Sequence, residues 1–264
     1  STGNIKDKKM GYYYADQAVF EEISKETGAG TSRHPLTYIL EAADDLAYKT
    51  ADIEDAYVKG FITFYDLEKE LEILQKKQNN ADFQPLDKLR TLYERGEEKG
   101  VSHPESYAVK NWIVRVQGYL ISCATSGFTS HYDEIMEGTF KEDLFYGTFG
   151  QDLMDLLGDM AYRYVFASRA IYKMEVTEAV ILDFLMDKLV HAVLYYDTDR
   201  PLGSIDSRVV SFISDNYKNA YRLQAKGKSE AEKLYLRLLL VTDYVCGMTD
   251  SYAKRLYQEM NGLV

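Results

Sequence analysis

The amino-acid sequence predicts an all-α protein, and three observations support this prediction. All four prolines stand near an expected helix start, where Pro is tolerated because its missing N–H has no intrahelical partner. Only 17 glycines and four prolines interrupt 264 residues, so long stretches run without a helix breaker. Segments with the alternating pattern of a β-strand are scarce.

The expected helices follow from start and stop signals along the chain. Thr63 with Asp66, and Ser229 with Glu232, have the spacing of helix-entry caps. Gly60 ends the first helix. The predicted helices cover residues 35–59, 63–78, 85–99, 104–125, 151–174, 177–196, 204–226 and 229–261.

One region does not fit this pattern. Residues 127–150 combine glycines with aromatic side chains, which predicts a loop or a short hairpin. No internal repeat, low-complexity tract or clear linker separates the other segments. The sequence therefore predicts a single all-helical unit over residues 1–264.

The composition excludes several classes of function. The net charge is -11 and no run of Lys or Arg exceeds two residues, which argues against DNA as the main partner. The two cysteines, Cys123 and Cys246, are far apart and form no metal-binding pair, which favours a reducing compartment. The apolar runs are too short to span a bilayer. We expect a soluble, cytoplasmic protein without a membrane partner.

An acidic segment, "RHPLTYILEAADDLAYKTADIED" at residues 33–55, is the strongest candidate site. On a helix, Asp44, Tyr48 and Asp52 follow one another by one turn along one side. An apolar stripe covers the rest: Leu36, Ile39, Leu40, Ala43, Leu46, Ala47 and Ile53. Carboxylate oxygens are ligands that hard divalent metals take. The spacing alone also fits an ordinary solvated acidic face.

Two other metal sites are poor fits to this segment. The aspartate-rich motif of isoprenoid-type enzymes needs a third Asp where "DDLAY" has Tyr48. A di-iron bundle needs Glu-x-x-His, and none of the four histidines has Glu three residues before it.

The same segment resembles the last metal-site helix of bacterial deoxyguanosinetriphosphate triphosphohydrolases, which are HD-domain phosphohydrolases. "KKMGYYYADQAVFEEI" at residues 8–23 and "VTDYVCGMTDSYAKRLYQEM" at 241–260 resemble further segments of that family. The resemblance covers most of the chain and implies the C-terminal part of an HD-domain-like helical bundle.

The resemblance also implies roles for individual residues. Asp44 matches the final metal-ligating Asp, Tyr48 the tyrosine that packs against the deoxyribose, and Asp52 the carboxylate that accepts from the sugar 3′-OH. Lys9, with Lys8, is a weaker candidate for a phosphate contact. The implied cofactor is a divalent metal such as Mg or Mn, and the implied reaction converts a dNTP and water into a deoxynucleoside and tripolyphosphate.

Part of the family's metal set is absent from this sequence. None of the four histidines is followed by Asp, so the His-Asp pair that the family places upstream is missing. We therefore expect the chain to be the C-terminal portion of a longer protein, to hold no catalytic metal by itself and to be inactive alone. The family implies a homo-oligomer, with dNTP or single-stranded DNA as effectors in some members. The alternative is a non-catalytic helical module for nucleotide sensing or scaffolding.

Overall fold

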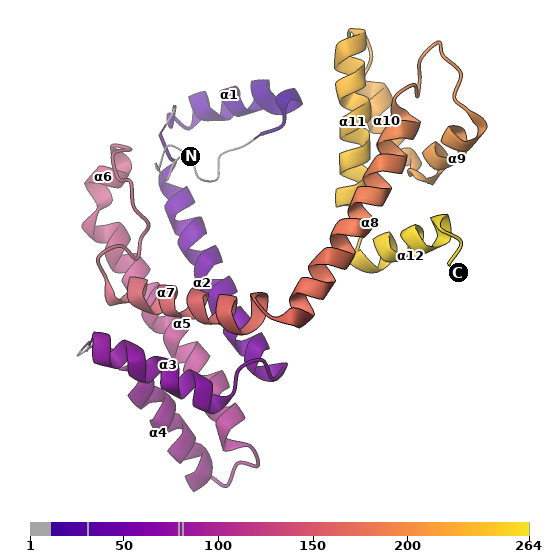
Figure 1. Cartoon of the computed structure of the whole chain (residues 1–264). Coiled ribbons are helices and arrows are strands. Elements are labelled where there is room, and N and C mark those ends of the chain that lie inside the picture. Colours follow the sequence, from indigo (N-terminus) through magenta and orange to yellow (C-terminus); the bar gives the residue numbers. More distant parts are fainter. Residues whose placement is uncertain (1–11, 31, 79, 81, 264) are drawn as a thin grey trace. The chain divides into compact units, whose positions relative to one another are not determined.

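The computed structural model describes residues 12–30, 32–78, 80 and 82–263, and it is helical throughout (Figure 1). No described residue lies in a strand, which confirms the all-α class. No helix in these ranges is both long and apolar enough to cross a membrane.

The chain divides into two compact units, the first ending at Ser168 and the second beginning at Arg169. Each unit has a separate hydrophobic core. The expectation of a single all-helical unit over the whole chain stays a prediction.

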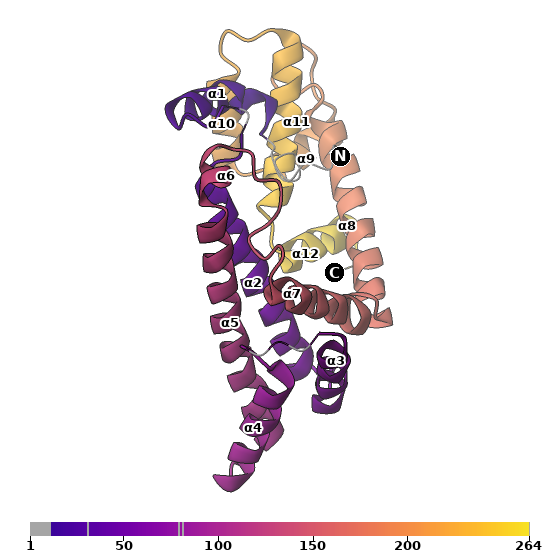
Figure 2. The ribbon, with the colours of Figure 1, turned by 90° about the vertical axis from the view of Figure 1, so that its left-hand side faces the viewer.

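The first unit is built around two long helices that pack against each other, α2 and α5 (Figure 2). α4 lies against α5, and α7 packs on α2, α3 and α5. Its elements are η2 (Tyr14–Asp16), α1 (Gln17–Glu26), α2 (Pro35–Val58), α3 (Phe64–Lys77), α4 (Pro85–Glu98), α5 (Pro104–Ser130), α6 (Tyr132–Met136), α7 (Phe149–Met160) and the π-helix η3 (Ala161–Phe166).

The second unit packs shorter helices on the C-terminal half of one long helix, α8. α9, α11 and α12 contact α8, and α10 packs on α11. The elements are α8 (Arg169–Val193), α9 (Ser204–Phe212), α10 (Asp215–Gln224), α11 (Glu230–Cys246) and α12 (Asp250–Met260).

The helix-start signals given by three prolines and by the two predicted caps are confirmed. Proline opens α2, α4 and α5, and both predicted caps form complete capping boxes. In the first of them, Asp66 N donates to Thr63 Oγ1 over 3.1 Å, and Thr63 N donates to Asp66 Oδ2 over 2.9 Å. Six of the eight predicted helices, those expected from residues 35, 63, 85, 104, 204 and 229, begin within one residue of the expected position.

Other boundaries were predicted wrongly. The predicted break between residues 174 and 177 lies inside α8, because α7 continues into the π-helix and the helical path is interrupted only at 167–168. The predicted helices 204–226 and 229–261 are each divided in two. The second division follows from a cap: Thr249 Oγ1 accepts from Tyr252 N over 3.3 Å and starts α12.

The region 127–150 contains a loop and no hairpin within the described residues. α5 extends to Ser130 and α6 follows after His131, so only His131 and residues 137–148 of this region lie outside helices. The Tyr38 hydroxyl donates to the Phe140 carbonyl oxygen over 2.7 Å, which fastens this loop to α2. A Cβ on Gly127 would collide with the carbonyl of Leu144, so glycine permits the close approach of loop and helix.

Candidate functional site

The candidate site lies on α2, which is continuous from Pro35 to Val58. Asp44, Tyr48 and Asp52 are therefore spaced by one helical turn each, about 6 Å along the axis, within one sector of the helix surface. Asp44 is exposed, Tyr48 is 65% exposed and Asp52 is partly buried. The structure thus places the three residues on one accessible face, as the sequence predicts.

The buried face of α2 differs from the expected apolar stripe. Of the stripe, only Leu46 and Ile53 are buried. Leu36, Ile39 and Leu40 are exposed, Leu40 to 70%. The helix packs instead through a different stripe, which combines one aromatic residue with aliphatic and small residues. The residues of this stripe are Tyr38, Ala42, Leu46, Thr50, Ile53 and Ala56.

This leaves an exposed apolar face beside the candidate residues. Leu36 and Leu40 are followed by Ala43 and Ala47, which are exposed as well. On a helix these positions lie next to the sector of Asp44 and Tyr48. Exposed apolar surface of this kind typically marks an interaction site.

The electrostatics of the face are set by the carboxylates at its C-terminal end. Partial burial raises the pKa of Asp52 above its ordinary value, and the negative charge of Asp55 raises it further. The cation of the same helix does not offset this, because Lys49 Nζ donates to the Met154 carbonyl of α7 over 3.1 Å. A hydrogen-bond donor or cation from outside the helix would be favoured near Asp52.

The N-terminus of α2 is fixed by two side chains. The Leu36 N–H donates to His34 Nδ1 over 3.2 Å, so His34 caps the helix. Arg33 is buried and pairs with Glu41, one turn before Asp45. Both residues hold the start of the helix in place.

An apolar groove lies beside the candidate residues, between α2 and α5. Its volume is about 240 Å³, and it is lined by Ile39, Ala42, Ala43, Leu46, Ile121, Ala124, Thr125, Phe128, Thr129 and Leu144. The groove includes none of the three candidate residues. It has no charged side chain, so it suits an apolar contact and not a phosphate group.

Side chains that can ligate a metal are scattered over the described part of the chain. Nowhere within residues 12–30, 32–78, 80 and 82–263 do three His, Cys, Asp or Glu side chains gather as a metal site requires. Asp44 offers one exposed carboxylate, which fits one position of a divalent metal's oxygen shell and no more. Lys9 lies outside the described residues.

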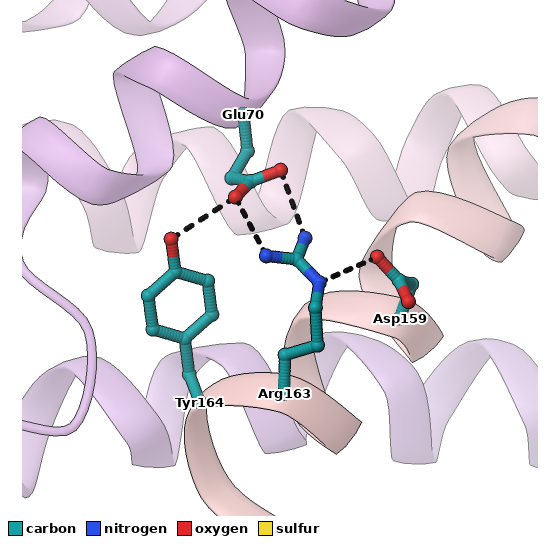
Figure 3. Close-up of polar contacts among 4 residues, drawn as sticks. All are labelled: Glu70, Asp159, Arg163 and Tyr164. Carbon is teal, nitrogen blue, oxygen red and sulfur yellow. Dashed lines mark hydrogen bonds and ion pairs between the residues drawn. The ribbon is translucent and has the colours of Figure 1, made fainter.

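A polar network around the buried Glu70 was missed from the sequence (Figure 3). The guanidinium of Arg163, on the π-helix, donates to both oxygens of Glu70 over 2.9 Å each. It also donates from Nε to Asp159 over 2.7 Å, and the Tyr164 hydroxyl donates to Glu70 over 3.0 Å. The hydrogen bonds from Arg163 hold the pKa of Glu70 below its ordinary value despite its burial.

The only local signal for this network is the four-residue spacing of Asp159 and Arg163. Glu70 comes from α3, 93 residues away from Arg163. The network ties α3 to the segment that packs against α2, and therefore supports the helix that carries the candidate site.

Comparison with known proteins gives matches over nearly the whole chain. The deoxyguanosinetriphosphate triphosphohydrolase-like proteins of Listeria monocytogenes and Listeria innocua are each 42% identical to it, over 98% of this chain and 55% of the relative. The protein named deoxyguanosinetriphosphate triphosphohydrolase in Yersinia enterocolitica is 24% identical, over 97% of this chain and 54% of its own length. No family model matches the sequence.

The chain is thus similar in sequence to proteins named deoxyguanosinetriphosphate triphosphohydrolase or deoxyguanosinetriphosphate triphosphohydrolase-like. The resemblance read from the sequence motifs is thereby confirmed. The chain spans about half the length of the triphosphohydrolases that it matches. A large part of those proteins therefore lies outside the match.

Proposed function

We propose that this chain contributes the sugar-binding wall and one metal ligand of a dNTP triphosphohydrolase. In the intact protein the reaction would convert a dNTP and water into a deoxynucleoside and tripolyphosphate. The observation that carries the proposal is the alignment of Asp44, Tyr48 and the partly buried Asp52 along one side of α2, in a chain 42% identical to triphosphohydrolase-like proteins.

Each side chain would have one task. Asp44 supplies one carboxylate to a divalent metal, which neutralises phosphate charge when it is bound. One turn on, the ring of Tyr48 packs against the deoxyribose and leaves no space for a 2′-hydroxyl. Asp52 accepts a hydrogen bond from the 3′-OH, and such a donor favours the charged form that burial disfavours.

The rest of the metal site would come from outside this chain. One carboxylate does not bind a catalytic metal tightly, because affinity depends on several preorganised ligands. We therefore propose that the chain alone is inactive. We also propose that the intact protein, and not this chain alone, forms a homo-oligomer and binds effectors.

The proposal is tested by supplying the part of the metal site that this chain lacks. The segment of the Listeria monocytogenes relative that this chain does not match is joined to the chain, and release of tripolyphosphate from dGTP is measured with Mn²⁺. We expect activity in the fusion and none in the 264-residue chain. Asp44→Asn abolishes the activity, whereas Asp187→Asn, which removes an exposed carboxylate of α8, does not.

Tyr48→Ala tests the sugar contact in the same fusion. We expect the preference for dGTP over GTP to fall, because the steric barrier to a 2′-hydroxyl is removed. A fusion that folds but releases no tripolyphosphate would favour the non-catalytic nucleotide-sensing module instead.

A further inference from the structure

Arg237, in the second unit, differs from the other buried polar residues. It lies on α11, and 4% of its surface is exposed. Arg33, Thr50 and Glu70 are also buried, and each has a bonding partner. Within the described ranges, Nε and Nη1 of Arg237 are buried and have no hydrogen-bond partner. No described carboxylate forms an ion pair with Arg237.

A second buried donor lies next to it. Tyr221 of α10 is 3% exposed, and its hydroxyl is buried without a hydrogen-bond partner among the described residues. Burial raises the pKa of Tyr221, and the positive charge of Arg237 opposes this rise. The guanidinium and the hydroxyl are therefore neighbours on the packed helices α10 and α11, although no hydrogen bond of good geometry joins them. Three groups that can donate, Nε and Nη1 of Arg237 and the Tyr221 hydroxyl, thus lack a bonded acceptor among the described residues.

Such a donor set is complementary to an oxyanion. A guanidinium stays charged in proteins, and a buried cation without a counter-charge is strongly unfavourable. A water molecule could accept one or two hydrogen bonds but would not neutralise the charge. An oxyanion does both, and Arg is the side chain best suited to phosphate and carboxylate groups.

We propose that Arg237 and Tyr221 form an oxyanion site in the second unit and that its ligand is a phosphate group. A phosphate has enough acceptor oxygens for all three donors and carries more charge than a carboxylate. The positive charge of Lys233 also acts on Tyr221, although Lys233 is paired with Glu230 over 2.9 Å. The site uses α10 and α11 and no residue of α2, so it is separate from the proposed function.

Two nearby carboxylates oppose the ligand. The pKa of Glu230 is lowered by its hydrogen bond with Lys233 and further by the positive charge of Arg237, so Glu230 also lies in this region. Asp197 raises the pKa of Tyr221 further, so its negative charge faces the same region. It is exposed, and its φ of 58° is the one left-handed value among the described non-glycine residues. Asn adopts this conformation readily, so Asp197→Asn removes the charge without straining the backbone.

The test measures phosphate binding to the 264-residue chain. Thermal unfolding is followed with increasing inorganic phosphate at constant ionic strength, with NaCl as the reference, and calorimetric titration gives Kd. We expect the Tm to rise with phosphate concentration, as for any ligand that binds only the folded state. Arg237→Met weakens binding by about 10- to 100-fold, the loss expected for hydrogen bonds to a charged group.

Two further variants keep the proposal testable if Arg237→Met does not fold. Tyr221→Phe weakens phosphate binding by roughly 3- to 10-fold, the value of one hydrogen bond. Asp197→Asn tightens it, because a like charge is removed. The matched control is Arg222→Met, since Arg222 is an exposed arginine of α10 that donates to Tyr196 and Asn219. It leaves Kd unchanged.

Titration with dGMP distinguishes two sources of the phosphate. A smaller Kd for dGMP than for inorganic phosphate, lost in Arg237→Met, identifies a nucleotide phosphate, and an equal Kd identifies the free ion. The proposal is overturned if phosphate stabilises the chain no more than NaCl does, or if Arg237→Met retains the full effect. It is equally overturned if Tyr221→Phe and Asp197→Asn both leave Kd unchanged.

Discussion

Single residues on α2 differ in whether they belong to the core or to the exposed face. Leu40 and Leu46 are both leucines of the same helix, yet Leu40 is 70% exposed and Leu46 is 8% exposed. Burial of a leucine side chain contributes on the order of 2 kcal/mol, whereas an exposed leucine contributes little. The two positions therefore form a matched pair for testing which face holds the fold together.

We expect Leu46→Ala to lower the free energy of unfolding by about 2–5 kcal/mol, because it leaves a cavity in the core. Leu40→Ala should change it by less than about 0.5 kcal/mol. Urea denaturation followed by circular dichroism measures both values. Equal losses in the two variants would show that the face with Leu40 is covered in the folded chain.

The pKa of Asp52 should depend on the neighbouring carboxylate of Asp55. Because its pKa is raised by burial and then by Asp55, Asp55→Asn should lower the pKa of Asp52. Carbon-detected NMR of the carboxyl groups gives the pKa directly, and Asp133→Asn, a change on α6, is the control. An unchanged titration of Asp52 would exclude the influence of Asp55.

The sign of the effect of Asp52 on stability follows from the same shift. Folding disfavours its charged form, so the folded state binds the proton more tightly than the unfolded state. The contribution of Asp52 to stability therefore falls as the pH rises from its ordinary pKa of 3.8 through the raised value. Asp52→Asn should remove this pH dependence.

At the scale of elements, Glu70 links α3 to the π-helix after α7. It is buried, while the Arg163 side chain is partly exposed. Solvent therefore screens part of this interaction. The geometry is nevertheless bidentate, which is the strongest arrangement for Arg and a carboxylate. The link positions the segment that packs on α2.

We expect Glu70→Gln to lower the free energy of unfolding by about 1–3 kcal/mol at pH 7, since a buried charged acceptor is lost. The pKa of Glu70 is lowered in the folded state, so its stabilising contribution is present above the ordinary value of 4.5. It is lost as the pH falls through the lowered value. The difference between wild type and variant should shrink over that window in urea denaturation at several pH values.

Glu68→Gln is the control for this prediction. Glu68 also lies on α3 and pairs with Arg90 over 2.7 Å, but both side chains are more exposed than Glu70. We expect a loss of less than about 1 kcal/mol. A loss as large as that of Glu70→Gln would mean that burial does not strengthen the interaction of Glu70 with Arg163.

At the scale of the whole molecule, two cores lie in one chain. Leu71 is fully buried in the first core and Leu185 in the second. Units with separate cores can unfold at different temperatures, whereas a single cooperative unit unfolds once. The number of transitions therefore tests whether residues 1–264 behave as one unit.

We expect two transitions in differential scanning calorimetry. Leu71→Ala should lower only one of the two Tm values and Leu185→Ala only the other, each variant losing about 2–5 kcal/mol in its own unit. One transition that both variants shift together would instead support the single all-helical unit that the sequence predicts.

The sequence by itself determined the all-helical class, the limits of α2 and the common face of Asp44, Tyr48 and Asp52. These properties are local, because the period of a helix fixes the angle between residues within one segment. Tertiary structure decided which apolar face of α2 is buried, the pairing of Glu70 with Arg163 and the isolation of Arg237. Those properties depend on which helices meet in space, and contacts between residues far apart in the chain leave no periodic signal in the sequence.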